Sequence, residues 1–251
     1  MKTNQPSLMV ILSHPDDESF SIGGTLAKYA SAGVKVILIC ATRGELGIPN
    51  ISPEETGKIR EAELYAAVKV IGISDVIFLG YRDGDLISVN SDEIIFRLIE
   101  FLQAEQPQAV VTFGPDGISG HSDHIAMSQF VTQAVDQSEI KTRLYYIAPS
   151  DATLQGCGVP PPSEIVGGFV TGIDVENYLV TKVRAMQCHV SQHPPYLGVP
   201  EEEARRLACH EYFTLVRPLS SQYLRQLRTS GRLKYWVNSA QTGNLLKNVS
   251  Q

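Results

Sequence analysis

The first 150 residues alternate short apolar runs with longer segments in which apolar residues recur every three or four positions. Short apolar runs bounded by turn residues predict buried strands, and the longer spacing predicts helices that bury one face. The predicted strands occupy residues 8–13, 35–41, 75–79, 109–113 and 143–148. The predicted helices occupy residues 21–32, 53–71, 91–105 and 122–136.

This alternation is typical of βαβ units, which place strands side by side in a parallel sheet between helices. We therefore expect a Rossmann-like, three-layer α/β fold with a mostly parallel sheet. Gly33, Gly72 and Pro107 follow three of the predicted helices, where residues that end helices are common. Open sheets of this kind bind ligands beyond the carboxyl ends of their strands, so we expect the catalytic site there.

The pattern changes after residue 150. It predicts an antiparallel strand near 165–175, a helix near 175–189 and a less regular region over 191–251. Residues 155–163, with three consecutive prolines, fit no element and could shape a substrate entrance. Because no repeat or clear linker divides the chain, residues 1–251 are predicted to form a single domain with a core of about 7–190.

Composition and charge narrow the class of protein. The net charge is −6 and no basic stripe is present, which argues against a nucleic-acid partner. No segment approaches the roughly 18 apolar residues of a membrane span, and the first apolar run is too short for a signal peptide, so we expect a cytoplasmic protein. The four cysteines form no CxxC pair, which favours free thiols. The sequence leaves open whether the protein forms a homo-oligomer.

A histidine and three consecutive acids follow the first predicted strand, in the motif His14-Pro15-Asp16-Asp17-Glu18. Adjacent carboxylates repel one another, and a divalent cation is the simplest way to remove that repulsion. The motif would supply one histidine and one carboxylate as ligands. Because a catalytic zinc usually takes three protein ligands and leaves one position open, a third ligand is expected elsewhere.

The motif His121-Ser122-Asp123-His124 can supply that ligand. It follows the fourth predicted strand through a glycine-rich loop and opens a helix, so it reaches the same end of the sheet as the first motif. Two histidines three positions apart lie on one helical face, where both could bind the metal or divide the work. Either motif alone also fits a helix N-terminus, but the two together favour a metal centre.

The combination of these motifs resembles the LmbE-like, or PIG-L, family of N-deacetylases, over roughly residues 8 to 189. The resemblance implies a zinc-dependent hydrolase that removes an N-acetyl or other N-acyl group from an N-acetylglucosamine-type amino sugar or its conjugate. Further segments that carry the likeness are Thr42-Arg43-Gly44-Glu45, Arg60-Glu61-Ala62-Glu63, Leu79-Gly80-Tyr81-Arg82-Asp83-Gly84, Lys182-Val183-Arg184-Ala185 and His189-Val190-Ser191-Gln192.

The resemblance also implies roles for individual residues. His14, Asp17 and His124 would be the zinc ligands, and Asp16 would be the general base. His121 would stabilise the oxyanion or protonate the leaving amine. Iron(II) or another divalent ion would suit the same ligands, because ligand type separates these metals poorly.

Other positions are expected around this centre. Asp123 is suited to orient a neighbouring histidine, and Glu18 fits either that task or a helix cap. The residues that match positions where relatives contact the sugar or line the cleft are Arg60, Asp83, Glu45 and His189. The first three also fit structural ion pairs, and His189 also fits a helix C-terminus.

Three other functions compete with this one. An amidase that acts on a larger thiol or sugar conjugate would use the same chemistry. A non-catalytic binding domain is disfavoured because the base and all three ligands are intact. A dinucleotide-binding enzyme needs a GxGxxG turn after the first strand, where this sequence has acids that would repel a pyrophosphate.

Overall fold

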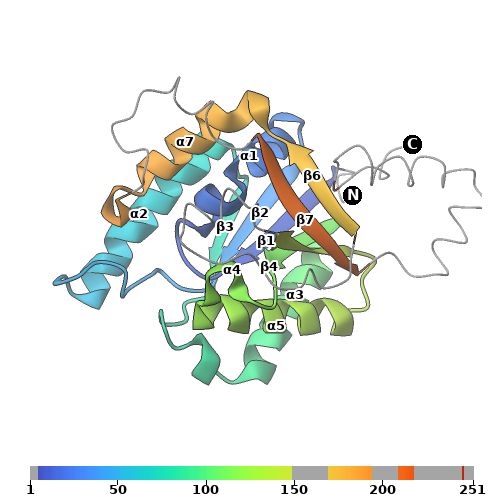
Figure 1. Cartoon of the computed structure of the whole chain (residues 1–251). Coiled ribbons are helices and arrows are strands. Elements are labelled where there is room, and N and C mark those ends of the chain that lie inside the picture. The colour runs from blue at the N-terminus through green and yellow to red at the C-terminus, as the bar shows by residue number, and fades with distance from the viewer. Residues whose placement is uncertain (1–4, 149–168, 194–208, 218–244, 246–251) are drawn as a thin grey trace, which may run out of the picture.

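The computed structural model describes residues 5–148, 169–193, 209–217 and 245. These residues form three layers, with a seven-stranded sheet between two sets of helices (Figure 1). The expected three-layer α/β fold is therefore confirmed. The proline-containing segment 155–163, expected near the substrate entrance, lies outside the described residues, as does most of 191–251.

The sheet has the order β3-β2-β1-β4-β5-β7-β6. The first five strands pair in parallel, whereas β7 is antiparallel to both β5 and β6. The five strands expected before residue 150 are each found within one residue of the predicted bounds. The strands are β1 (Ser7–Leu12), β2 (Lys35–Cys40), β3 (Asp75–Phe78), β4 (Ala109–Phe113), β5 (Arg143–Ala148), β6 (Phe169–Asp174) and β7 (His210–Arg217).

The strand order reverses between β1 and β4. The chain runs from β1 outward through β2 to β3, and then returns to place β4 on the other side of β1. The helices that follow β1 and β4 therefore lie on opposite faces of the sheet. Such a reversal is where open α/β sheets bind their ligands. The two histidine motifs follow these two strands.

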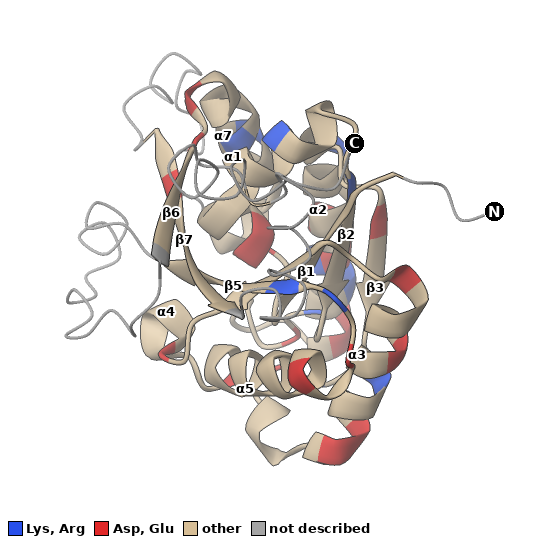
Figure 2. Ribbon diagram, turned by 90° about the vertical axis from the view of Figure 1, so that its right-hand side faces the viewer, with Lys and Arg blue, Asp and Glu red and all other residues tan. Residues whose placement is uncertain are grey.

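Helices cover both faces of the sheet. Helices α1, α2 and α7 lie on one face, and α3 and α5 lie on the other, as the two views of the ribbon show (Figures 1 and 2). The helices are α1 (Asp17–Ser31), α2 (Pro53–Ile71), α3 (Ser91–Glu105), the short α4 (Gly117–Gly120), α5 (Ser122–Gln137) and α7 (Leu179–Cys188), with single turns at Leu86–Ser88, Glu176–Tyr178 and Val190–Gln192.

Helix α1 begins at Asp17, four residues before the predicted start at residue 21. The apolar periodicity that predicts a helix begins only after the acids, so the sequence pattern misses this first turn. The helix is kinked at Ile22, whose backbone has φ −140° and ψ 20°. The separate first turn carries Asp17 and Glu18 at a helix N-terminus, which favours negative charge.

Residues 191–251 are expected to be less regular than the core of about 7–190, and the described part of them includes strand β7. That strand lies inside the sheet, between β5 and β6, with Phe213 fully buried. Leu245 is also fully buried. The strand pattern is hidden in the sequence because Glu211 occupies one of the buried positions, where an apolar residue would have marked the alternation. Strand β6 and helix α7 lie within the ranges expected for them.

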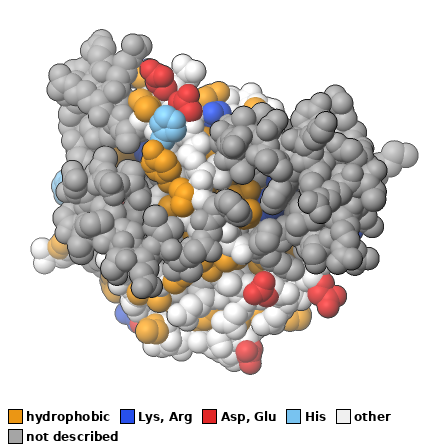
Figure 3. All heavy atoms as spheres, turned by 45° about the vertical axis from the view of Figure 1, so that its right-hand side comes forward, with side chains coloured by type: hydrophobic (Ala, Val, Ile, Leu, Met, Phe, Trp, Pro, Cys, Tyr) orange, Lys and Arg blue, Asp and Glu red, His pale blue; other side chains and the backbone are white. Residues whose placement is uncertain are grey.

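Within the described part of the chain, none of the helices is both long enough and apolar enough to cross a membrane. Lys and Arg positions are spread over several elements in the ribbon (Figure 2). On the face that Figure 3 presents, the described surface mixes apolar, polar and a few charged side chains.

Candidate metal centre

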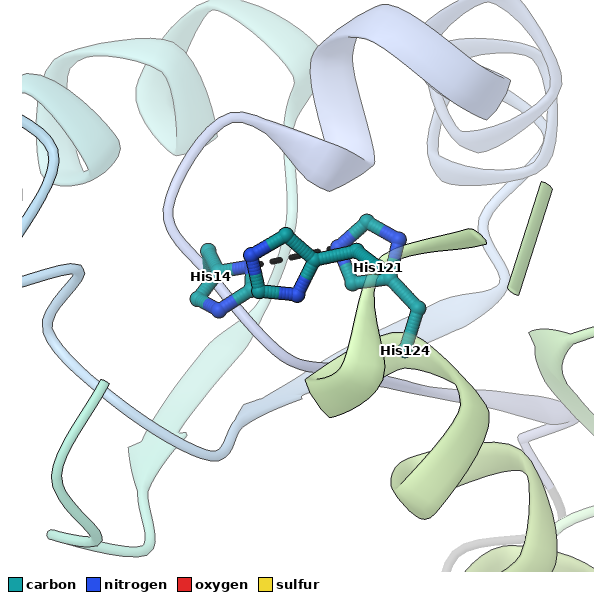
Figure 4. Close-up of side chains that lie close together, drawn as sticks. All are labelled: His14, His121 and His124. Carbon is teal, nitrogen blue, oxygen red and sulfur yellow. Dashed lines mark hydrogen bonds between the residues drawn. The ribbon is translucent and has the colours of Figure 1, made fainter. Parts of the chain in front are cut away.

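Three side chains converge beyond the carboxyl ends of β1 and β4. His14 Nδ1 lies 3.1 Å from His124 Nε2, the contact dashed in Figure 4. The Asp17 carboxylate lies 3.7 Å from His14 Nδ1 and 3.3 Å from His124 Nε2. The structure thus brings two imidazole nitrogens and a carboxylate close together, and among the described residues His14, His121 and His124 also offer ring nitrogens that lie within 4.8 Å of one another. Imidazole nitrogens and a carboxylate form a donor set that suits zinc and several other divalent metals.

The ring of His14 is held from its other side. His14 Nε2 lies 3.2 Å from Asp123 Oδ2 and 3.1 Å from Asp83 Oδ1. Asp123 is itself fixed by the backbone N–H groups of Gly84, at 2.8 Å, and Leu86, at 3.2 Å. A hydrogen on Nε2 would satisfy these acids and leave the Nδ1 lone pair facing Asp17, an arrangement common for histidines that bind metals.

His124 is oriented by the loop that precedes it. Its Nδ1 lies 3.1 Å from the carbonyl oxygen of Gly117. Because a carbonyl only accepts hydrogen bonds, Nδ1 carries the hydrogen and Nε2 keeps its lone pair toward Asp17. The ring also stacks on Phe113, with centroids 4.0 Å apart. Sequence reasoning identified the glycine-rich loop but not this carbonyl, because a backbone contact leaves no residue-type signal.

His121 is the most exposed of the three histidines in Figure 4. It caps α5, with Nδ1 accepting the backbone N–H of Asp123 at 3.2 Å. Its ring centroid lies 4.8 Å from that of His14 and 5.0 Å from that of His124. Since Nδ1 accepts, the neutral ring carries its hydrogen on Nε2 and can donate there. Burial and the neighbouring histidines lower the pKa of His121, which favours this neutral form.

The histidines and acids that converge here favour one another's charged forms. Burial disfavours a charged His14, but hydrogen bonds with Asp123 and Asp83 and the charge of Asp17 outweigh it and raise the pKa of His14 to about 10. Burial would raise the pKa of Asp17, but His124 and His14 hold it well below its usual range. Burial lowers the pKa of His124, but the nearby charge of Asp17 raises it more, so the pKa is raised overall.

Asp16 precedes α1 in an unusual backbone conformation, with φ 111°. A residue other than glycine in such a conformation costs roughly 1–3 kcal/mol and needs support from its surroundings. Its carboxylate lies 3.1 Å from Arg60 Nη2. Burial and the charge of Asp17 outweigh Arg60 and raise the pKa of Asp16 to about 7. A carboxylate with such a pKa is suited to accept a proton near neutral pH.

Arg60 lies behind Asp16 and is only 4% exposed. Its guanidinium donates to the carbonyl oxygens of Pro15, at 2.6 Å, and Gly44, at 3.0 Å, besides its contact with Asp16. Gly44 and Gly47 leave no space for a Cβ beside it. The sequence placed Arg60 among the sugar contacts, but these contacts point to support of Asp16.

Asp83 and Glu45 join the loops that follow β3 and β2. Glu45 Oε2 accepts the backbone N–H of Asp83 at 3.2 Å, and Asp83 Oδ2 accepts that of Leu46 at 3.0 Å. Asp83 therefore lies beside His14, within the cluster, whereas Glu45 braces its loop from a half-buried position.

His189 does not line an open surface, because it is fully buried. Its Nε2 lies 2.9 Å from Glu18 Oε1, and Glu18 Oε2 accepts the backbone N–H of Asp16 at 3.0 Å. Glu18 thus contacts no ligand histidine in the described structure and instead reaches back over the start of α1. The sequence identified both residues but could not place them together, since 171 positions separate them.

The fold and the cluster define an α/β protein with a possible metal site of histidines and acids at its strand-order reversal. The family model described as "PIG-L: GlcNAc-PI de-N-acetylase" matches residues 9–135, and the chain belongs to this family. The membership confirms the predicted enzyme class, a deacetylase that hydrolyses an amide bond.

Similar proteins include two curated enzymes and one solved structure. The chain is 30% identical to the 1D-myo-inositol 2-acetamido-2-deoxy-alpha-D-glucopyranoside deacetylase of Acidothermus cellulolyticus, over 84% of this chain and 89% of that one. It is 29% identical to the probable N-acetyl-alpha-D-glucosaminyl L-malate deacetylase 2 of Bacillus anthracis, over 75% and 82%. The N,N'-diacetylchitobiose deacetylase of Pyrococcus horikoshii has the same fold, with a TM-score of 0.63, 21% identity and coverage of 84% and 83%.

Proposed function

We propose that the protein is a zinc-dependent hydrolase that removes the N-acetyl group from an N-acetylglucosamine conjugate. The observation that carries the proposal is the convergence of His14 Nδ1, His124 Nε2 and the Asp17 carboxylate. Two nitrogens and one oxygen, with a fourth position left for a reactant, form the donor set of a catalytic rather than a structural zinc site.

The residues fit this metal, and we assign His14, Asp17 and His124 as its ligands. Both rings carry their hydrogen on the nitrogen that faces away, held by Asp123 for His14 and by the Gly117 carbonyl for His124. Zinc, when bound, makes a water molecule acidic enough to ionise near neutral pH and polarises the amide carbonyl. Iron(II) would suit the same donors, so the identity of the metal is part of the proposal.

Asp16 transfers protons, and His121 stabilises the charge that develops. Asp16, whose raised pKa of about 7 suits a base, takes a proton from the attacking water. Negative charge then develops on the substrate carbonyl oxygen, and the Nε2 hydrogen of His121 is available to stabilise it. The leaving amine needs a proton when the C–N bond breaks, and Asp16, which took a proton from the water, can donate it.

The substrate class follows from the relatives. Those named above act, by their names, on N-acetylglucosamine joined to inositol, to malate or to a second sugar. The amino sugar is common to all of them and the attached group differs. We therefore propose N-acetylglucosamine as the recognised unit, with the attached group to be found. A larger amide conjugate remains the alternative for the same chemistry.

The test is a panel of substrates and variants. Zinc-loaded protein should release free amine from N-acetylglucosamine joined to inositol or malate, from diacetylchitobiose or from N-acetylglucosamine itself, and elemental analysis should find about one zinc per chain. His14→Ala and His124→Ala should lose the metal. Asp16→Asn should keep the metal and lower kcat by about 10²–10⁴-fold. Near wild-type turnover by a fully loaded Asp16→Asn protein would rule out the base, and no amine from any substrate would rule out the function.

Several expectations stay predictions. They are a cytoplasmic location, a single domain, a homo-oligomer, and contacts of Asp83 and Glu45 with the sugar. For Arg60 we propose support of the Asp16 carboxylate in place of a sugar contact, because its guanidinium is buried and its Nη atoms are engaged within the protein.

A further inference from the structure

A buried chain of contacts joins the end of α7 to the backbone of Asp16. The backbone N–H of Asp16 donates to Glu18 Oε2 at 3.0 Å, and Glu18 Oε1 lies 2.9 Å from His189 Nε2. Glu18 and His189 are both fully buried. The chain therefore crosses, within the protein interior, from the residue that follows α7 to the residue that precedes α1.

The contacts of His189 are directed at this chain. Its Nε2 faces Glu18 Oε1 and, at 3.4 Å, Ser19 Oγ. Its Nδ1 has no hydrogen-bond partner in the described structure. Ser19 Oγ in turn donates to Glu18 Oε1 at 2.5 Å. In the described structure the ring of His189 thus contacts Glu18 and the hydroxyl that hydrogen-bonds to Glu18.

Asp16 is the residue that most needs such support. Its φ of 111° is rarely adopted by residues with a side chain, so the conformation persists only if neighbours impose it. Arg60 holds the Asp16 carboxylate, and Glu18 holds the Asp16 backbone N–H. His189 and Ser19 both contact Glu18 Oε1, so they hold in place the carboxylate that accepts this N–H.

We propose that His189 is a positioning residue, which acts through Glu18 to hold the backbone of Asp16 in the conformation that aims its carboxylate at the reacting water. The inference rests on the proposed function, because it concerns the base of that reaction. His189 contacts neither the three proposed ligands nor, being buried, an open surface. Its loss should therefore misplace the base without removing the metal.

Neighbouring residues of the same segment provide a matched control. Ser191 donates its backbone N–H and its hydroxyl to Glu63, at 2.7 and 2.6 Å, and this pair does not reach Asp16. Ser191→Ala removes two side-chain hydrogen bonds from the segment that carries His189, the one to Glu63 and the one that Gln192 Nε2 donates to Ser191 Oγ. It reports how far loosening of that segment alone affects the enzyme.

The experiment compares Glu18→Met, His189→Ala, His189→Gln and Ser191→Ala. Glu18→Met and His189→Ala should each lower kcat by about 10–100-fold, the scale expected for a misplaced catalytic group, with KM and bound zinc within about twofold of wild type. A glutamine side chain in place of the imidazole can still donate to Glu18, so His189→Gln should keep at least about a third of kcat. Ser191→Ala should stay within about threefold of wild type.

A double variant tests whether the two residues act as one chain. Glu18→Met with His189→Ala should lose no more kcat than Glu18→Met alone, because both changes release the same N–H. In parallel, hydrogen exchange at the Asp16 amide should accelerate at least about tenfold in Glu18→Met and His189→Ala, but not in Ser191→Ala. This second measurement needs no substrate. If His189→Ala does not fold, His189→Gln and Glu18→Met carry the test.

The outcomes separate the two proposals. A wild-type enzyme that deacetylates, with His189→Ala at full kcat or with multiplicative losses in the double variant, overturns the positioning role and leaves the proposed function standing. Loss of zinc in His189→Ala would also overturn it. If wild-type protein releases no amine from any substrate, the proposed function fails. The hydrogen-exchange rate of the Asp16 amide still tests whether His189 and Glu18 protect that N–H.

Discussion

Both ring nitrogens of His14 have partners. Asp83 and Asp123 face Nε2, while His124 and Asp17 face Nδ1. Two carboxylates behind one imidazole make its other nitrogen a more basic ligand. The same carboxylates also stabilise a protonated ring, which is why the pKa of His14 is raised to about 10. In the proposed site, a metal ion and a proton would therefore compete for Nδ1.

This competition predicts a pH-dependent affinity for zinc. Below the raised pKa of about 10, protein stripped of metal holds a proton on His14 that zinc must displace. Between pH 6 and 8, the Kd for zinc should therefore fall as pH rises, by about tenfold per pH unit for each proton released. Calorimetric titrations in buffers of different ionisation enthalpy count these protons. Affinity that does not change with pH would contradict the prediction, and His121→Ala should keep the slope.

At this scale, sequence reasoning identified which residues gather but not how they face one another. The βαβ pattern predicts a parallel sheet with both histidine motifs at the carboxyl ends of its strands, whereas the strand order that makes β1 and β4 neighbours comes from the structure. The partners of Arg60 and His189 do not follow from the pattern either. They depend on how α2 and α7 pack against α1, which spacing along the chain does not encode.

The connection between β4 and α5 shows how one loop can orient His124, a proposed metal ligand. Gly117 adopts φ 66°, and its carbonyl oxygen accepts a hydrogen bond from His124 Nδ1. Ile118 next to it has φ 63° and ψ −58°, a rare conformation for a β-branched residue. Strain of this kind persists where the surrounding structure imposes it, and it is common at functional sites.

Gly117→Ala should weaken metal binding. A Cβ at Gly117 would lie 2.9 Å from His124 Cβ, too close for real atoms, so His124 must move. We expect zinc affinity to fall at least about tenfold, as for other changes that disturb the support of a ligand. Gly120→Ala is the matched control, because Gly120 also has a positive φ, 78°, but nothing lies within 4 Å of its Cβ position.

Both substitutions carry a similar backbone cost, about 1–3 kcal/mol, so both should lower the melting temperature. Only Gly117→Ala should lose zinc, measured by competition with a chromogenic chelator. Equal zinc affinities in the two variants would show that the Gly117 backbone does not position His124.

The elements before residue 150 could be predicted because each buries an apolar face with a regular period. The pattern missed the first turn of α1 and the whole of β7, and both carry acids at buried positions. Asp17 and Glu18 occupy the first turn of α1, and Glu211 lies in β7. Apolar periodicity does not detect a buried acid, so residues that serve the site or its support are the ones that hide an element.

Glu211 joins the last described strand to the first helix. Its carboxylate accepts the backbone N–H groups of Gly24, at 3.1 Å, and Thr25, at 2.7 Å, just after the kink at Ile22. Lys182 of α7 lies 2.6 Å from the same carboxylate. Glu211 therefore caps the second part of α1 and fixes the direction in which its first turn, with Asp17, points.

Glu211→Gln should destabilise the whole molecule. It removes one charge of a buried pair and leaves Lys182 and a backbone N–H without their full partner, which should cost about 3–5 kcal/mol of unfolding free energy. At roughly 2–4 °C per kcal/mol for a chain of this size, the melting temperature should fall by about 6–20 °C. Calorimetry of zinc-loaded protein measures it.

The control replaces both charges, in the double variant Glu211→Leu with Lys182→Met. Apolar residues of similar size in place of a buried pair are often neutral or stabilising, so the double variant should recover much of the lost stability. If the double variant is less stable than Glu211→Gln, then the contacts of the carboxylate with the α1 backbone, rather than the unpaired charge, dominate the loss.

Strand β7 also decides what an incomplete copy of the chain would do. In the described sheet β6 pairs only with β7, and β7 is the second neighbour of β5. The histidine motifs are synthesised long before β7. Until β7 is made, β5 is an edge strand with unpaired N–H and C=O groups. Such an edge is a template for pairing with other chains. Translation that stops before residue 210 is therefore expected to yield aggregates rather than a smaller enzyme.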